Sequence, residues 1–229
     1  FNGVGRTEIY AIIPSTVNET NFFGEIIGGK AVEIDYTDLT FNNDAVLAGE
    51  NLTAQGTAAG HLVNPGTQFE YWKDGYWLKA VSAGSESVLT ANKDASILSN
   101  GGYYNTALHV WGKSQAEFNG KTSITVQNGV DTARAVYVYD DYDGTTRAEF
   151  NDDLTISTAG SNATYLYGID VRAGGKVDVT KGLIMNDNNN ITWSLFAMGN
   201  DSKIDINSSA SGEVQVVGLS LIHISEPTR

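Results

Sequence analysis

The sequence predicts an all-β protein, folded as a right-handed parallel β-helix (a solenoid) with coils of 27–32 residues. Short segments that alternate apolar and polar residues recur along the chain, which is the pattern of strands. The clearest are AEFN at 116–119, AEFN at 148–151, VDVT at 177–180 and IDIN at 204–207. Their third residues, here called markers, lie 32, 29 and 27 positions apart. Stretches rich in Gly and Asn, residues that tolerate tight corners, separate the segments.

A repeat of this length with about three short strands cannot bury its own apolar face, but copies stacked on one another can. Equivalent strands then lie about 4.8 Å apart in long parallel sheets, and connections between parallel strands are right-handed. An antiparallel sandwich also contains many short strands. Apolar positions recur eight residues before and six residues after most markers, and this constancy favours the solenoid over the sandwich.

Period-two alternation indicates which side chains face inward. We expect ten apolar side chains to be buried and stacked in columns: Ile97, Val110, Phe118, Ile124, Phe150, Ile156, Val171, Val179, Met198 and Ile206. We expect four carboxylates to face outward in the middle of their strands: Glu117, Glu149, Asp178 and Asp205. The polar insertion 139–145 should protrude from a corner, with the carboxylates of Asp140, Asp141 and Asp143 exposed to solvent.

The first ninety residues fit the period less well. Residues 31–41 are typical of a pair of strands, and residues 68–81 are typical of a β-hairpin, an outgrowth of the solenoid with Asp74-Gly75 as its turn. We expect residues 1–218 to form one β-helical body that is incomplete at both ends. The last segment, 219–229, reads LSLIHISEPTR and resembles a translated sequencing adapter, so we expect an artefactual tail. The alternative is an ordinary terminal strand.

Residues 148–182 resemble the passenger regions of autotransporter adhesins from Gram-negative bacteria, and the resemblance extends over about 80–218. It rests on the pattern GI-x-V-x-x-GGK followed by an alternating pair, here Gly168, Ile169, Val171, Gly174, Gly175, Lys176, Val177 and Val179. The resemblance implies a β-helix that is displayed on the bacterial cell surface or secreted. It also implies an outer-membrane barrel in the full-length protein and a glycan or protein of the host cell surface or matrix as partner.

Composition excludes several kinds of chemistry. The chain carries 14 Lys and Arg against 27 Asp and Glu, so it is a poor candidate for binding nucleic acid. It has no Cys, and therefore no disulfide, catalytic thiolate or Cys-bound zinc. No apolar run reaches the length of a membrane span. No nucleotide-binding or nucleophile motif appears, so we expect neither a cofactor nor an enzyme.

Two groups of residues are candidate binding sites. Aromatic side chains crowd the expected hairpin at Tyr71, Trp72, Tyr76 and Trp77, where they would form a platform for a ligand or pack the hairpin onto the solenoid. Asp141 and Asp143 form half of a calcium loop, since Tyr139 stands where a third Asp belongs. The alternative to weak calcium binding is a solvated acidic corner.

The histidines His61 and His109 are isolated, so both are expected to be surface residues.

The sequence therefore favours a fragment of a surface-exposed, adhesin-like autotransporter passenger that displays corner loops on a rigid rod. One alternative is a secreted polysaccharide-active enzyme on the same fold, a lyase or glycosidase. In that case three carboxylates, or carboxylates with Arg or Lys, should converge in one groove, whereas Asp residues scattered at corners would favour the rod. The other alternative is a trimeric phage tailspike or tail-fibre segment. The fold alone does not separate these functions.

Overall fold

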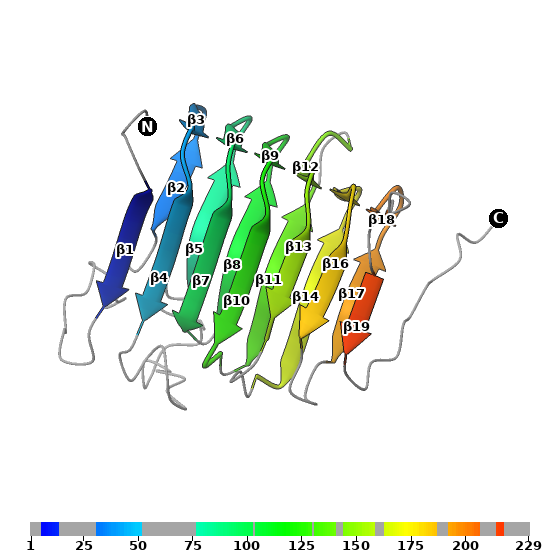
Figure 1. Ribbon diagram of the computed structural model, residues 1–229. Helices are drawn as coiled ribbons and strands as arrows, with labels where there is room; N and C mark the ends of the chain where they lie inside the picture. The colour runs from blue at the N-terminus through cyan, green and yellow to red at the C-terminus, as the bar shows by residue number, and fades with distance from the viewer. Residues whose placement is uncertain are drawn as a thin grey trace, which may run out of the picture.

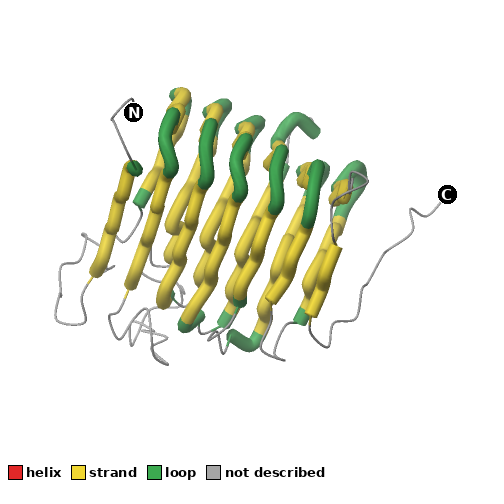
Figure 2. The backbone as a smooth tube through the Cα atoms, in the orientation of Figure 1, coloured by secondary structure: helices red, strands yellow, loops and turns green. Residues whose placement is uncertain are grey.

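The computed structural model is built of parallel strands stacked as a β-solenoid (Figures 1 and 2). It describes residues 6–13, 31–51, 77–102, 104–129, 131–140, 144–158, 163–186, 192–206 and 214–217. Every strand pair within these ranges is parallel, and the ranges contain no helix. The described residues accordingly include no helix with the length and hydropathy of a membrane span.

Successive strands turn through three sheets, and strands equivalent by sequence become neighbours in the same sheet. The first sheet contains β1 (Thr7–Ile13), β4 (Ala45–Asn51), β7 (Ala95–Gly101), β10 (Thr122–Gln127), β13 (Leu154–Ser157), β16 (Leu183–Asn186) and β19 (Val214–Val217). The second contains β2 (Val32–Asp35), β5 (Trp77–Gly84), β8 (Tyr104–Trp111), β11 (Thr132–Tyr139), β14 (Tyr165–Arg172) and β17 (Trp193–Met198). The third contains β3 (Asp38–Phe41), β6 (Val88–Ala91), β9 (Gln115–Phe118), β12 (Arg147–Phe150), β15 (Lys176–Val179) and β18 (Lys203–Ile206).

The apolar columns expected from the sequence fill the interior. Of the ten residues expected inside, all except Met198 and Ile206 are at most 1% exposed. Ile97, Ile124 and Ile156 are in register in the first sheet. In the third sheet the markers are in register, as expected, and Ile206 is half-buried against the core.

The four carboxylates expected outside also form a column, which lies on the outer face of the third sheet. Glu117, Glu149, Asp178 and Asp205 are in register on successive strands, and each is half-buried. Salt bridges with Arg147 and Lys203 accompany Glu149 and Asp205. The register deduced from the markers is therefore confirmed for β9, β12, β15 and β18.

The expectation for Met198 is wrong, because this side chain faces outward. Met198 is 49% exposed and pairs with Arg172, while Ala197 pairs with the buried Val171. The corner between β17 and β18, residues 199–202, is one residue longer than the equivalent corner 173–175. Since side chains alternate along a strand, counting eight residues back from the marker across this longer corner ends on an outward residue instead of an inward one. Leu195 packs against the core instead.

The first coil differs from the others in length. Phe41 pairs with Ala91, fifty residues further on, whereas Ala91 pairs with Phe118 after 27 residues. Of the expected hairpin, residues 77–81 lie in β5, which has a parallel neighbour on each side and belongs to the solenoid wall. The remainder of that hairpin, 68–76, and the segment 219–229 lie outside the described residues.

The longer strands of the second sheet bend in the middle. Ala135 and Val136 are consecutive, yet both are fully buried in the core. Ala107 and Leu108 behave in the same way one coil earlier. Because two consecutive residues face inward, the residues on either side of the bend both face outward. This bend places side chains three positions apart on one outer surface.

Asn side chains at one corner form a ladder along the stack. Asn92 donates to Asn42 at 2.6 Å, Asn119 donates to Asn92 at 3.2 Å, and Asn151 donates to Asn119 at 2.8 Å. Thr180 extends the ladder by donating to Asn151 at 3.5 Å. Each bond joins one coil to the next, so the Asn residues abundant between the strands fasten the stack as well as shape its corners.

The insertion after β11 begins inside the protein. Asp140 is fully buried, and its Oδ2 accepts a hydrogen bond from the backbone N–H of Thr146 at 3.0 Å. Its own N–H donates to the carbonyl of Arg172 at 3.2 Å. The expected exposure of Asp140 is therefore wrong, because its carboxylate is needed to close the base of the loop. Asp141 and Asp143 lie outside the described residues.

Candidate functional site

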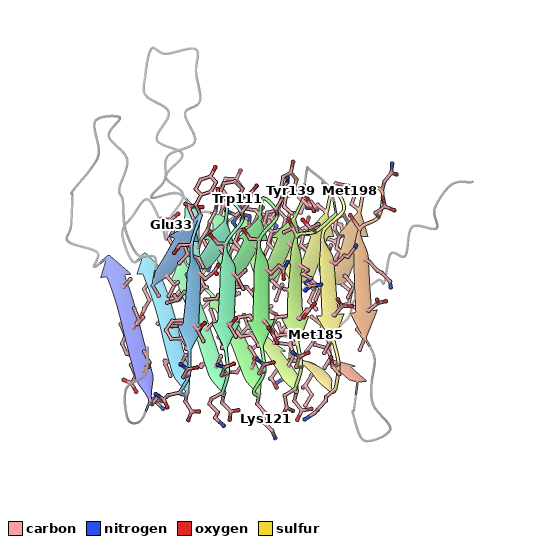
Figure 3. All side chains as sticks on the ribbon, turned by 90° about the horizontal axis from the view of Figure 1, so that it is seen from above. Glu33, Trp111, Lys121, Tyr139, Met185 and Met198 are labelled. Atoms are coloured by element: carbon pink, nitrogen blue, oxygen red, sulfur yellow. The ribbon has the colours of Figure 1, made fainter. Side chains whose placement is uncertain are left out.

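The outer face of the second sheet has an unusual composition for this acidic chain. We call the outward side chains of β5, β8, β11, β14 and β17 the aromatic–basic face. They form three columns: Lys79, Thr106, Arg134, Tyr167 and Trp193; Ser82, His109, Tyr137, Asp170 and Phe196; and Trp111, Tyr139, Arg172 and Met198. Figure 3 shows Trp111, Tyr139 and Met198 along this face, with Glu33 of β2 at one end. Three cations accompany one carboxylate, although acidic residues dominate the whole sequence.

Asp170 is at the centre of the face and binds two arginines. It is fully buried, its Oδ2 accepts a hydrogen bond from Nε of Arg134 at 2.7 Å, and its Oδ1 accepts one from Nε of Arg172 at 2.8 Å. A buried carboxylate requires such partners, because its removal from water is costly. One carboxylate paired with two guanidinium groups leaves a positive charge at this point. Burial by itself would lower the pKa of Arg172, but the hydrogen bond and negative charge of Asp170 outweigh it and raise that pKa.

Aromatic rings hold both guanidinium groups in place. The guanidinium carbon of Arg134 lies 4.6 Å from the ring centre of Tyr137 and 5.3 Å from that of Tyr167. The guanidinium carbon of Arg172 lies 5.2 Å from the ring centre of Phe196. Such contacts are favourable because the face of an aromatic ring attracts a cation. Burial raises the pKa of the Tyr137 and Tyr167 phenols, which therefore stay neutral near pH 7. The two arginines are thus fixed before any ligand arrives.

The rings of this face stack along the solenoid axis. Tyr167 and Trp193 have ring centres 4.9 Å apart and planes tilted by 22°. Tyr165, which flanks the face on β14, stacks on Trp193 with centres 6.4 Å apart, and His109 stacks on Tyr137 at 5.1 Å. Because stacked rings cover one another's faces, they present mainly edges and polar tips to solvent. These stacked rings therefore do not favour a contact in which a sugar lies flat on a ring.

His109 is buried beneath this layer. It is 7% exposed, its ring stacks with those of Trp111 and Tyr137, and its Nδ1 has no hydrogen-bond partner among the described residues. Burial, and then the positive charges of Lys79 and Arg134, hold the pKa of His109 well below its usual value of 6.5. The sequence correctly indicated an outward position, but the expected surface histidine is a buried, neutral one.

The residues proposed from the sequence as binding sites are largely outside the described chain. Tyr71, Trp72 and Tyr76 belong to the undescribed range, as do Asp141 and Asp143. The backbone of Trp77 begins β5 and pairs with Tyr104, which places it beside the aromatic–basic face. Both the aromatic platform and the weak calcium site therefore stay predictions.

The aromatic–basic face carried a signal that single-residue inspection of the sequence misses. His109 and Asp170 each lie nine residues before their markers, and Tyr137 is the equivalent residue in the coil between them. Aligning the coils on their markers puts these three side chains in one outward column. The bend at Ala135 and Val136 left no such signal, and without it Arg134 would be assigned to the interior.

A concave region lies on the outer face of the first sheet. Its lining includes Arg6, Asp44, Asp94, Lys121 and Asp153. Asp94 accepts a hydrogen bond from the backbone N–H of Lys121 at 2.9 Å, and Asp153 accepts one from the backbone N–H of Gly182 at 3.2 Å. These carboxylates therefore connect one coil to the next, as the Asn ladder does. No group of three His, Asp or Glu side chains arranged to hold a metal occurs within the described ranges.

Comparison with models of known protein families, with curated proteins and with solved structures found no match to this chain. The fold is a parallel β-solenoid, and the chemistry of its surfaces indicates what it can bind.

Proposed function

We propose that this chain is a fragment of a surface-exposed, adhesin-like autotransporter passenger, a rigid rod that binds through its outer faces and corner loops. The aromatic–basic face is the observation that carries the proposal. It extends over five neighbouring strands, and its charged groups are fixed by Asp170 and by the rings of Tyr137 and Tyr167. Groups that are ordered before binding lose less conformational entropy when a ligand arrives, which suits a binding surface.

The proposed setting follows from the sequence resemblance to Gram-negative passengers. The fragment would lie on the cell surface or be secreted, attached in the full-length protein to an outer-membrane barrel. Its partner would be a glycan or protein of the host cell surface or matrix. The solenoid supports this role because coils fastened by side-chain ladders give a stiff, extended scaffold.

Adhesion is testable with the isolated chain. Beads coated with the chain are expected to attach to epithelial cells or matrix-coated surfaces more than beads coated with the Trp193→Ala/Phe196→Ala variant. The variant removes two rings at the β17 edge of the face. Attachment that is equal for both proteins, or equal to that of uncoated beads, would contradict the proposal. Circular dichroism of the variant shows whether the solenoid is intact.

A polysaccharide-active enzyme is the second candidate, because Asp170, Arg134 and Arg172 converge and His109 lies in the same column. Asp170 uses both oxygens to bind arginines, which makes it a positioning group rather than a proton donor. The two functions differ in their products. Incubation with polysaccharides, followed by assays for new reducing ends and unsaturated sugars, should show no turnover for an adhesin.

A further inference from the structure

We infer that the aromatic–basic face binds an acidic glycan, a linear polysaccharide whose carboxylate or sulfate groups meet the fixed arginines. This inference rests on the proposed binding function and names its ligand class. The charge of the face is the first argument. Lys79 of β5, Arg134 of β11 and Arg172 of β14 accompany the one carboxylate, Asp170, in a chain that has almost twice as many acidic as basic residues.

The arrangement of the cations is the second argument. Arg134 and Arg172 are held by their Nε atoms, and a guanidinium group can present its remaining N–H groups to a carboxylate or sulfate in a paired, planar geometry. Lys79 and Arg134 lie in one column with Thr106 between them, so they are two strands apart, about 10 Å along the axis. This distance is close to the length of a disaccharide, the repeating unit of many acidic polysaccharides.

The overall charge of the chain favours an acidic glycan over denser polyanions. A nucleic acid carries a phosphate on every nucleotide and would be repelled by the many carboxylates elsewhere on this protein. Glu33 and Asp35 are exposed at the β2 end of the same sheet and limit the cationic surface to the following strands. A sparsely charged polymer can place its anionic groups at the cations and its hydroxyl groups at the phenol and indole edges between them.

The test measures binding of the whole chain to polygalacturonate and to the same polymer with its carboxylates methyl-esterified. We expect affinity for the acidic polymer only, weakening as salt is added. The Arg172→Gln variant should lose affinity about tenfold, since it removes a charge-assisted contact while Asp170 keeps Arg134. Lys79→Gln, which does not touch Asp170, should also weaken binding. Lys181→Gln makes the same change of charge at a corner away from this face and should have no effect.

Three outcomes would overturn the inference: equal binding of the esterified polymer, an equal loss of affinity in the Lys181→Gln control, or binding of duplex DNA or anionic lipid vesicles but not of the acidic polymer. Failure of this inference is distinguishable from failure of the proposed function. Beads that attach to cells without binding acidic polymers would refute the ligand class alone. Binding followed by depolymerisation would confirm the ligand class and identify an enzyme.

Discussion

At the scale of single residues, His109 lies in β8 with cations on both sides, Lys79 from β5 and Arg134 from β11, while Tyr137 stacks on it and Asp170 lies one strand further. Its pKa in the folded protein is lower than the value of 6.5 expected in the unfolded chain. Below that value the unfolded chain therefore binds more protons, and the free energy of unfolding falls as the pH drops through this window.

Urea unfolding between about pH 7.5 and about pH 5 tests this expectation. The wild-type protein should lose up to about 1.4 kcal/mol per pH unit more than the His109→Gln variant, which does not titrate there. The comparison between the two proteins removes the contribution of the carboxylates, which is common to both. Parallel pH profiles would show that the protonation of His109 is not coupled to folding.

Gly168 shows how closely neighbouring coils pack. A Cβ at this position would overlap Cε of Met185 and come within 2.5 Å of the carbonyl oxygen of Ser194. The equivalent residues in earlier coils are Ala135 and Ala107, where the facing core side chains are Ile156 and Ile124. The longer Met185 side chain thus occupies the space that the missing Cβ leaves.

Gly168→Ala should destabilise the protein by about 1–3 kcal/mol, measured by chemical denaturation. Combining it with Met185→Ile should recover part of that loss, because Ile is shorter and already occurs in this column. The recovery should be incomplete, since the Ser194 backbone stays in place. The effects of the two single substitutions on the free energy of unfolding can be added and compared with the effect measured for the double variant. A double variant that is no more stable than this sum would contradict the proposed contact.

At the scale of elements, the Asn ladder predicts a graded series. Asn119 bonds to Asn92 on one side and Asn151 on the other, whereas the hydroxyl of Thr180 at the end of the ladder donates one longer bond to Asn151. Each such bond contributes about 0.5–1.5 kcal/mol. Asn119→Ala should therefore lower the free energy of unfolding by about 1–2 kcal/mol and by more than Thr180→Val does. Equal effects, or an effect near zero for Asn119→Ala, would show that solvent replaces these bonds at no cost.

Most strands were predictable from the sequence because their alternation repeats from coil to coil. The markers predicted the register of β9, β12, β15 and β18, since Phe118, Phe150, Val179 and Ile206 share one position in their strands. The register of β17 was not predictable in this way, because nothing in the local pattern reveals a longer corner. Phe196 and Met198 alternate as regularly as Leu195 and Ala197, and only the count of residues in the corner decides which pair is buried.

The candidate site was less predictable than the fold. Its chemistry depends on side chains that are far apart in sequence and adjacent only after stacking, such as Arg134 and Asp170. The burial of His109 follows from rings contributed by its own strand and the next one. Such contacts become visible in a sequence only after all coils are aligned, including the coil with the insertion at 139–145.

At the scale of the whole molecule, a stack of coils has mainly nearest-neighbour energetics. The rings of Phe118 and Phe150 lie in adjacent coils with centres 5.2 Å apart. Phe41 is in the same column, separated from Phe118 by Ala91. Substitutions in adjacent coils should therefore interact, while those in separated coils should not.

A double-mutant cycle of Phe118→Leu and Phe150→Leu should give a coupling free energy of about 0.5–1.5 kcal/mol. The matched cycle of Phe41→Leu and Phe150→Leu should be additive within about 0.5 kcal/mol. Both cycles are read from denaturant unfolding of the four proteins concerned. Strong coupling in the second cycle would mean that the solenoid transmits strain along its length instead of between neighbours.

The corner at 199–202 has a consequence for how proteins of this shape evolve. It holds one residue more than the corner at 173–175, yet the strands on both sides keep the pairing of the preceding coil, since Met198 pairs with Arg172 and Lys203 pairs with Lys176. A corner can therefore absorb one codon without turning either strand over. Deleting one codon from 199–202 would reproduce the corner that follows Arg172 and leave Phe196 and Met198 on the outer face. A codon inserted within a strand, by contrast, moves every side chain beyond it to the other face. In a β-solenoid the place of an insertion therefore matters more than its size.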